Sequence, residues 1–582
     1  MDNLSELLLQ VQKPARYIGG EWNMVKKDWT PDKVKILLAF PEVYEIGMSY
    51  LGLKILYGIL NKRDDCLCER VFSPWQDFED ILRKNKMSLF SLESRQPMKE
   101  FDIIGISLAY ELNYTNALNL LDLGGIAFKS SDRRDGDPII IAGGPACYNP
   151  EPMSEFIDAF VIGDGEDAII DVVGVYRNSA NHESGIVNRK KILRELAKIH
   201  GVYVPSLYET EYNNDGTIKS FKPKEADVPG RIQKRIVKDL DNSFYPTAQL
   251  VPYIQIVHDR IMLEIMRGCK HACKFCQAGT TYRPRRERSK EEVLRIAREV
   301  YSKTGYEEIT LLSLSSGDHS HIKEMIEELN SMFKEKYVSI SVPSLRIEDI
   351  LSKLPTLVSK VKKSGLTFAP EAGSECLRKA INKNIDIEKL MEALKESYRS
   401  GWRRVKLYFM IGLPTEKEED LERIAKLLYK VSNLRREVDG KDANVTASIN
   451  AFVPKPHTPF QWEAMEPIDS LLSKKIFLKD SVKSRMIEMD FNSFYMGYLE
   501  AVFARGDRKL SGVLYEAYSK GAKFDGWKDH FNFNLWMESF KAIGVDPDFY
   551  ASRRRGPDEI FPWNFIDIGY SVLPHVDKAA SI

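Results

Sequence analysis

Cysteine is scarce in this sequence, with seven residues in a chain of 582. An odd and sparse set does not make the disulfide framework of a small secreted protein, which needs paired cysteines at close spacing. No apolar run approaches the roughly 18 residues that a membrane-spanning helix needs, and the first residues lack the basic-then-apolar order of a signal peptide. The sequence therefore predicts a protein that works in the reducing cytoplasm and does not enter a membrane.

An excess of charge of either sign is also missing. Lysine plus arginine and aspartate plus glutamate both number 84, so the formal net charge is zero, and no global field attracts a polyanionic partner. The hydrophobic share of 43% is ordinary for a globular protein. A chain of this length exceeds one ordinary core, and about two to four domains are expected.

What the sequence does have is three cysteines in one short segment. Cys269, Cys273 and Cys276 stand at C-x3-C-x2-C spacing after an apolar run at residues 261–266, which predicts a strand followed by a loop. Thiolates ligate iron–sulfur clusters and zinc. Zinc needs a fourth ligand, which His271 could provide, whereas a cubane held by three cysteines keeps one iron open for a substrate. Plain buried cysteines are a third interpretation.

This segment resembles the cluster loop of the radical S-adenosylmethionine (SAM) superfamily, whose pattern C-x3-C-x-Φ-C is completed here by the aromatic Phe275. The resemblance implies that Cys269, Cys273 and Cys276 ligate a [4Fe-4S] cluster. It also implies that the amino and carboxylate groups of SAM chelate the open iron, with Phe275 beside the cofactors.

The part of the chain before this motif alternates predicted strands and helices. Between residues 35 and 175, short apolar runs are separated by helical patterns, which predicts an open parallel sheet. Ligands of such sheets bind outside the carboxyl ends of the strands. Glycine at a strand end lets a bulky ligand approach the backbone, although each single glycine could equally belong to a tight turn. The candidate ligand-binding residues at these ends are Tyr44, Gly47, Tyr110, Gly143, Gly144, Gly163 and Gly165.

The Gly-Gly-Pro and Gly-Asp-Gly-Glu segments that begin at Gly143 and Gly163 resemble those of the cobalamin-binding domain that precedes many radical SAM barrels. The resemblance implies that the candidate residues bind cobalamin. The first loop, residues 44–52, lacks the Asp-x-His-x-x-Gly sequence of the His-on form, which implies base-off cobalamin without a histidine ligand from this loop. A domain of the same shape that does not bind the cofactor is the alternative.

Residues 251–480 repeat the strand–helix alternation six times. Six parallel strands with outer helices predict a partial (β/α)6 barrel of the TIM type, in which the chemistry lies at the carboxyl ends of the strands. The resemblance to the radical SAM superfamily assigns SAM binding to residues at these ends. They are Ser316, Gly317, Asp318, Arg346, Glu371 and Ser374.

These residues differ in the role that the resemblance implies. Residues 316–318 take the place of the segment that holds the SAM amino group, and Glu371 and Ser374 match the position that contacts the SAM ribose or carboxylate. Arg346 ends the third strand, where a cation could pair with the SAM carboxylate. The structural alternatives are a salt bridge on the barrel rim for Arg346 and a carboxylate at a helix N-terminus for Glu371.

The remaining segments carry no chemical motif. Residues 1–34 form an extension, residues 176–250 a linker with a β-hairpin, and residues 481–582 a mostly helical region. Two basic runs, at 283–288 and 553–555, are interpreted as solvated loops or cover for a bound cofactor, with contact to RNA phosphates as the alternative.

The predicted fold class is thus α/β, with a cobalamin-binding-like open sheet, a radical SAM barrel and a helical carboxyl-terminal region. The whole chain resembles a group of cobalamin-binding-domain radical SAM proteins. This implies reductive cleavage of SAM, an external one-electron donor of the flavodoxin or ferredoxin type and, as the leading hypothesis, methyl transfer to an unactivated carbon. A rearrangement or sulfur insertion is a first alternative. A non-enzymatic iron–sulfur protein that binds RNA or a ribosome component is a second. The sequence does not give the substrate.

Overall fold

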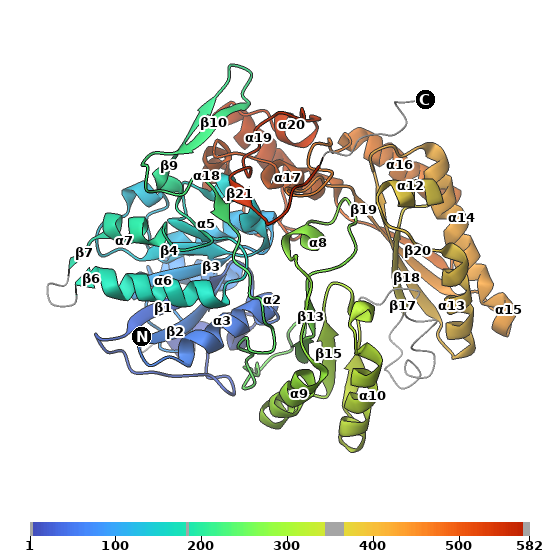
Figure 1. Ribbon diagram of the computed structural model, residues 1–582, viewed down its shortest axis with the longest axis horizontal. Coiled ribbons are helices and arrows are strands. Elements are labelled where there is room, and N and C mark those ends of the chain that lie inside the picture. The colour runs from blue at the N-terminus through green and yellow to red at the C-terminus, as the bar shows by residue number, and fades with distance from the viewer. Residues whose placement is uncertain (1–3, 182–185, 344–365, 574–582) are drawn as a thin grey trace.

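The computed structural model describes residues 4–181, 186–343 and 366–573, and Figure 1 shows how their elements are arranged. The amino-terminal part is built on a sheet of order β2-β1-β3-β4-β5-β8, in which the first five strands run parallel and β8 is antiparallel. The predicted open parallel sheet is therefore confirmed. Its strands are β1 (Val34–Phe40), β2 (Cys66–Phe72), β3 (Ile103–Ser107), β4 (Ile139–Gly143), β5 (Ala159–Val161) and β8 (Val202–Tyr203).

Helices cover both faces of this sheet, which explains why its strands are apolar without interruption. Leu37 and Ala39 of β1 belong to one buried core with side chains of α4 and α5, whereas Ile36 and Leu38 belong to another with side chains of α3 and α6. Successive residues of a strand point to opposite faces, so a run of apolar residues serves both cores. The covering helices are α3 (Leu51–Asn61), α4 (Gln76–Lys84), α5 (Tyr114–Leu123) and α6 (Glu166–Ser179).

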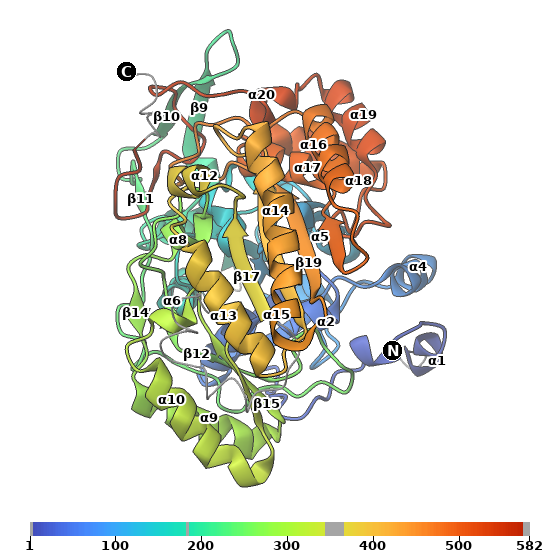
Figure 2. The same cartoon turned by 90° about the vertical axis from the view of Figure 1, so that its right-hand side faces the viewer.

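The barrel consists of two parallel sheets, of order β12-β15-β16 and β17-β18-β19-β20. Figure 2 shows α13 and α14 on the outer face of the second sheet. The strands are β12 (Ile261–Glu264), β15 (Glu308–Leu312), β16 (Ser339–Ser341), β17 (Leu366–Glu371), β18 (Arg404–Ile411), β19 (Asn444–Ala451) and β20 (Ile487–Phe491). The main outer helices are α9 (Lys290–Thr304), α10 (Ile322–Phe333), α13 (Ile387–Arg399), α14 (Glu418–Leu434) and α16 (Ile468–Ser481).

The barrel strands do not end at residue 480, because β20 adds a seventh described strand inside the segment where helices were expected. Its sequence, Ile-Glu-Met-Asp-Phe, alternates apolar and acidic residues, and only its two ends are buried. Such a pattern suits an edge strand that packs on one side only. The local signal is short, and pairing with β19 fixes the strand.

The carboxyl-terminal helices lie between the amino-terminal sheet and the barrel (Figure 1). Trp527 Nε1 donates to Glu42 Oε1 at 3.0 Å, beyond the end of β1. Asn149, beyond β4, donates to the carbonyl oxygens of Ala504 at 3.0 Å and Gly506 at 2.8 Å. The region therefore joins the two larger parts. Its helices are α17 (Phe494–Ala504), α18 (Leu510–Ser519), α19 (Phe533–Ile543) and α20 (Asp548–Ala551).

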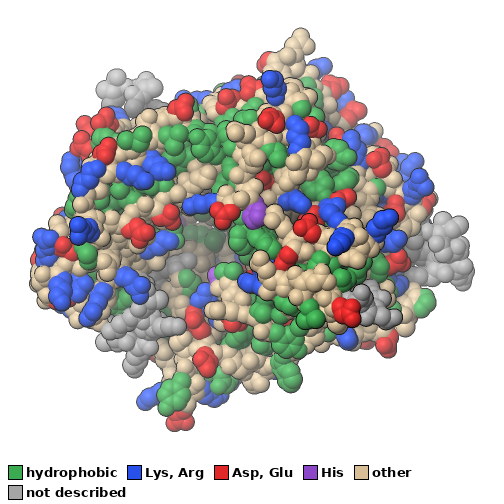
Figure 3. All heavy atoms as spheres, turned by 180° about the vertical axis from the view of Figure 1, so that it is seen from behind, with side chains coloured by type: hydrophobic (Ala, Val, Ile, Leu, Met, Phe, Trp, Pro, Cys, Tyr) green, Lys and Arg blue, Asp and Glu red, His purple; other side chains and the backbone are tan. Residues whose placement is uncertain are grey.

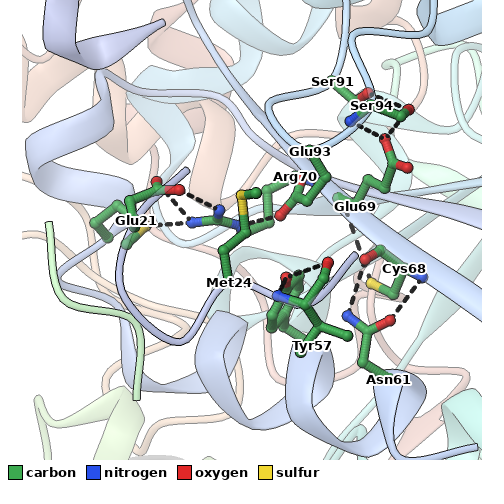
Figure 4. A network of polar contacts seen from close by, with 12 residues as sticks. Glu21, Met24, Tyr57, Asn61, Cys68, Glu69, Arg70, Ser91, Glu93 and Ser94 are labelled. Carbon is green, nitrogen blue, oxygen red and sulfur yellow. Dashed lines mark hydrogen bonds and ion pairs between the residues drawn. The ribbon is translucent and has the colours of Figure 1, made fainter. Parts of the chain in front are cut away.

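A buried ion-pair network ties the amino-terminal extension to the sheet (Figure 4). Arg70 of β2 is fully buried, with Nη2 at 2.9 Å from Glu21 Oε2 and Nε at 2.6 Å from Glu93 Oε1. Tyr44 donates to Glu21 Oε1 at 2.9 Å. Burial raises the pKa of Glu93 to about 7, although Arg70 opposes this. Burial acts the same way on Glu21, but there Arg70 outweighs it and holds the pKa below its usual value.

We expect the network to make stability depend on pH through Glu93. The pKa of Glu93 is higher in the folded chain than its ordinary value of 4.5, so its stabilising contribution is complete below that value and is lost as the pH rises through about 7. The melting temperature of the unchanged, cluster-free protein should fall between about pH 5 and about pH 8. In Glu93→Gln this fall should be smaller by roughly 2–4 °C. Glu327→Gln, on the exposed face of α10, is the matched control. Equal pH profiles of Glu93→Gln and the unchanged protein would contradict this assignment.

Candidate active site

The motif cysteines lie in a segment that is closed at its base by a short ribbon. Strand β13 (Met266–Arg267) pairs antiparallel with β14 (Arg286–Glu287). Residues 268–285 between them are called here the cysteine loop. Gly268 begins the loop with a φ of 84°, and a Cβ there would lie 2.7 Å from two carbonyl oxygens at the far end of the loop. Only glycine fits this position.

The three thiols are half-buried and face one neighbourhood. Cys276 caps helix α8 (Gln277–Thr281), and its Sγ accepts a hydrogen bond from the Gly279 amide at 3.2 Å. Burial raises the pKa of Cys276, and repulsion from Cys273 and Cys269 raises it further. Bound iron would offset this repulsion.

The contact that His271 makes weighs against its role as a zinc ligand. Within the described ranges of the chain, no three side chains of His, Cys, Asp or Glu are grouped so as to hold one metal ion. The ligands of a cubane stand farther apart than those of zinc, because the cubane itself is larger. His271, the possible fourth zinc ligand, instead has Nε2 at 2.7 Å from Asp318 Oδ2.

Asp318 lies at the end of β15 and contacts the cysteine loop. Besides His271, Lys270 Nζ lies 2.8 Å from its Oδ1. Burial opposes ionisation of Asp318, but its close contacts with His271 and Lys270 outweigh it and hold its pKa well below the usual range. The SAM role predicted for Asp318 thus competes with contacts to the loop. Neighbouring Ser316 and Gly317 are buried, and the Ser316 hydroxyl bonds within its own strand end.

The other side of the cysteine loop packs on the segment after β17. Phe275 packs against a small core that includes Leu377 and Ile381. Asn382 Nδ2 donates to the Ala272 carbonyl at 2.8 Å. The aromatic position of the motif therefore anchors the loop to the second barrel sheet.

This docking brings the strand-four candidates close to the loop. Glu371 ends β17 with a φ of 69°, a conformation that costs a non-glycine residue about 1–3 kcal/mol and that gathers at functional sites. Burial raises its pKa despite Lys383, whose Nζ lies 3.4 Å from Oε1. Ser374 caps α12 (Glu375–Ala380) by accepting from the Leu377 amide. The sixth SAM candidate, Arg346, lies outside the described residues.

The amino-terminal sheet meets the cysteine loop at its carboxyl edge. Tyr148, beyond β4, donates from its hydroxyl to the Thr281 carbonyl at 3.2 Å. His457, in the loop after β19, places Nε2 2.9 Å from the Tyr148 carbonyl. Burial lowers the pKa of His457 to about 4, so the ring is neutral and donates. His457 is thus a structural residue of this junction.

The two candidate tyrosines of the sheet edge already have protein partners. The Tyr44 hydroxyl bonds Glu21, as described above, and Tyr110 donates to Glu500 Oε2 of α17 at 2.7 Å. Lys455 Nζ lies 2.8 Å from both Glu500 Oε1 and Glu111 Oε1, which follows Tyr110. The Tyr110 hydroxyl therefore belongs to a charged contact among all three parts of the molecule.

The five candidate glycines divide into two groups. A Cβ on Gly47 would lie 2.3 Å from a neighbouring aromatic ring, on Gly144 2.6 Å and on Gly163 2.2 Å from a carbonyl oxygen, so packing alone requires glycine there. Gly143 and Gly165 are half-exposed, and a Cβ on either would meet only ordinary contacts. These two leave room for a ligand against the backbone.

Both basic runs turn out to be used inside the protein. Arg286 bonds the Asp164 carboxylate, Arg288 lies 5.3 Å from the Tyr245 ring, and Arg555 is buried against Phe561. The prediction of solvated loops is wrong for these three residues. The acidic partner of Arg286 is Asp164 of the Gly-Asp-Gly-Glu segment, whereas the sequence analysis singles out only the glycines of that segment. The charge match between that segment and the basic run was the available signal.

Comparison with known proteins agrees with this architecture. Residues 263–428 match the radical SAM superfamily, and residues 52–205 match the family described as radical SAM proteins, N-terminal. A protein of Methanocaldococcus jannaschii is 29% identical over 83% of this chain and 91% of its own. A ribosomal-protein methylthiotransferase of Thermoanaerobacter is 22% identical over 28% of this chain and 38% of its own.

Among solved structures, the fold is similar to that of the radical SAM methyltransferase TsrM from Kitasatospora setae, determined with cobalamin and a [4Fe-4S] cluster bound. The TM-score is 0.50 at 12% identity, over 74% of this chain and 77% of TsrM. The chain is thus an enzyme of the radical SAM class. More particularly, it belongs to the radical SAM superfamily as a member with an α/β domain before its barrel.

The cluster assignment predicts the effect of removing a single thiol. In anaerobically reconstituted protein, Cys273→Ala should lower the iron content at least about tenfold and abolish the cluster's visible absorbance, because two thiolates do not hold a cubane. Cys376→Ala, at an exposed cysteine of α12, is the matched control and should bind iron normally. Iron bound equally by both variants would show that the ligands are elsewhere.

Proposed function

We propose that this enzyme uses a corrinoid together with a [4Fe-4S] cluster and SAM, and that it transfers a methyl group to an unactivated carbon of its substrate. The observation that carries the proposal is the contact between the cysteine loop and the carboxyl edge of the amino-terminal sheet, where Tyr148 bonds the Thr281 carbonyl at 3.2 Å. Ligands of such sheets bind at this edge. A corrinoid there would stand beside the cluster.

When bound, the cluster and SAM supply a 5′-deoxyadenosyl radical and the corrinoid supplies a methyl group; the chain's own residues place these groups. Cys269, Cys273 and Cys276 hold the cluster, with Phe275 fixing their loop to the barrel. Glu371 offers a buried carboxyl group to the amino or ribose groups of SAM. An external one-electron donor of the flavodoxin or ferredoxin class, in a reducing cytoplasm, completes the requirements of reductive cleavage.

The sheet edge fits a corrinoid that receives no imidazole from the protein loop below it. Gly143 and Gly165 are half-exposed and leave space at the backbone. Residues 44–52 contain no histidine, so the lower face would meet water or no axial ligand. TsrM, which shares the fold, was determined with cobalamin bound, and this supports the same cofactor here.

The other function classes have less support. The methylthiotransferase relatives cover only about a third of this chain, and sulfur insertion therefore remains the second candidate. An RNA- or ribosome-binding role would need exposed cations, but the buried arginines of both basic runs are used internally. Figure 3 shows the molecule from the side opposite to that in Figure 1, and positive and negative side chains are interspersed on this face. Among the residues that the structure describes, no helix is long and apolar enough to cross a bilayer.

The products formed from SAM test the proposal. Reduced, cluster-loaded protein should release 5′-deoxyadenosine and methionine, and it should form S-adenosylhomocysteine only when a corrinoid is present. Cys273→Ala should lower both by more than about a hundredfold, since the open iron is lost. The binder alternative gains support if no product forms while RNA stays bound at high salt. If 5′-deoxyadenosine forms but no S-adenosylhomocysteine appears when corrinoid is added, a rearrangement or sulfur insertion is favoured.

A second variant tests the place of the corrinoid. Gly143→Val adds a branched side chain at a strand end where the nearest atoms to a Cβ are 3.8 Å away. The fold should tolerate it, whereas a ligand against the backbone would clash, weakening corrinoid binding at least about tenfold. Gly174→Ala, in open space on α6, is the control. Corrinoid affinity that is unchanged in Gly143→Val would exclude this edge as the site.

A further inference from the structure

The base of the cysteine loop holds two cations directly opposite each other. Arg267 of β13 and Arg286 of β14 are paired residues of the antiparallel ribbon. Like charges at paired positions repel, and both side chains are less than a tenth exposed, so water screens them little. An anion that contacts both guanidinium groups would offset this repulsion and stabilise the ribbon that closes the loop.

Asp164 of the amino-terminal domain is that anion. Its Oδ1 lies 3.1 Å from Arg267 Nη1 and its Oδ2 lies 2.6 Å from Arg286 Nη1. One oxygen thus serves each arginine. Burial opposes ionisation of Asp164, but the two arginines outweigh it and hold its pKa below the usual value. Glu166 and, from the barrel itself, Glu264 each lie 2.8 Å from Arg267 Nη2, but neither is paired with Arg286, so Asp164 is the carboxylate that joins the two arginines.

The fold fixes Asp164 from the side of the amino-terminal domain. Gly163 before it has a φ of 106°, and a Cβ there would lie 2.2 Å from the Arg235 carbonyl oxygen. The Asp164 amide donates to the same carbonyl at 3.0 Å, and the Val237 amide donates to Asp164 Oδ2 at 2.8 Å. The position of the carboxylate is therefore fixed by contacts that do not involve the ribbon.

The far end of the cysteine loop is held in a similar way. Lys234 Nζ donates to the carbonyl oxygens of Thr281 at 2.9 Å and Arg283 at 2.5 Å. Tyr148 donates to the Thr281 carbonyl as well. Groups outside the barrel thus contact the chain on both sides of the three cysteines: Asp164 before Cys269, and Lys234 after Cys276.

We propose that Asp164 is a positioning residue, which sets the geometry of the cysteine loop by bridging Arg267 and Arg286. It couples the amino-terminal domain to the three thiolates. The inference deepens the proposed function, on which its relevance to catalysis rests. The Gly-Asp-Gly-Glu segment then has a role apart from any ligand at the sheet edge: its acidic residues face the barrel.

The test compares amide hydrogen exchange of residues 268–285 in full-length variants without the cluster. Asp164→Asn keeps the shape of the side chain and removes its charge. Exchange in this segment should become at least about tenfold faster, while the amino-terminal strands keep their protection. The double variant Asp164→Asn/Arg286→Gln removes the repulsion as well and should recover most of the protection.

A matched control lies at the other end of the same strand. Asp158, just before β5, is also fully buried and also bonds two arginines, Arg133 and Arg189, but it contacts no part of the cysteine loop in the described structure. Asp158→Asn should leave exchange in residues 268–285 unchanged. If Asp164→Asn has no effect there, if the Asp158 variant loosens the loop equally, or if the double variant shows no recovery, the proposal is overturned.

Reconstituted protein provides a second readout. Asp164→Asn should retain less than about half of the iron that the unchanged chain binds, and its cluster should have a shifted reduction potential, because the hydrogen bonds and burial around the thiolates change. Neither exchange nor iron content depends on SAM cleavage. If the unchanged protein does not cleave SAM but Asp164→Asn still shows faster exchange and lower iron content, the proposed function is refuted and this inference stands.

Discussion

The contact between the amino-terminal sheet and the cysteine loop is the constraint on which the rest of the molecule depends. A cluster held by three thiolates needs its ligands fixed, yet a loop of this length has few apolar side chains with which to fix itself. Phe275 and Gly268 anchor it within the barrel. Asp318 and Asn382 hold it from the barrel as well, and Asp164 and Tyr148 of the other domain add further contacts. The amino-terminal domain therefore contributes directly to the position of the loop that carries the three cysteines.

Much of this junction is polar, which has a thermodynamic consequence. Burying charges costs several kcal/mol per ion, and a well-formed pair roughly offsets that cost. Such contacts add little net stability. When the two partners of a pair are moved apart, however, each charge stays buried without compensation, and the free energy of folding becomes less favourable. Lys455 lies between Glu111 and Glu500 and joins all three parts of the molecule. Its buried charge likewise depends on both partners staying in place. These pairs define one relative orientation of the parts, whereas a smooth apolar interface would allow several.

The sequence predicts the strands of the amino-terminal sheet well, because their uninterrupted apolar residues serve two cores at once. Spacing singles out the three cysteines and the resemblance to the radical SAM cluster loop makes them cluster ligands, an assignment that stays a prediction; the structure shows all three half-buried in one loop. The sequence does not predict what Asp318 and Tyr110 contact, since their partners, His271 and Glu500, are brought to them by the fold. Strand β20 was missed for a related reason, because pairing with β19 outweighs its weak local pattern. Side chains whose role depends on a partner distant in sequence are those that periodicity cannot assign.

The two buried networks differ in how they respond to protons. Around Arg70, burial raises the pKa of Glu93 to about 7, so ionisation of this carboxyl opposes folding in the neutral range. At the junction, the arginines keep Asp164 ionised well below that range, and burial lowers the pKa of His457 to about 4. Asp164 and His457 therefore keep one protonation state near neutral pH, whereas burial lowers the pKa of Lys234, which donates to the cysteine loop, to about 8. A rise of pH through about 7 would therefore ionise Glu93 beside Arg70 before it neutralised Lys234 at the cysteine loop.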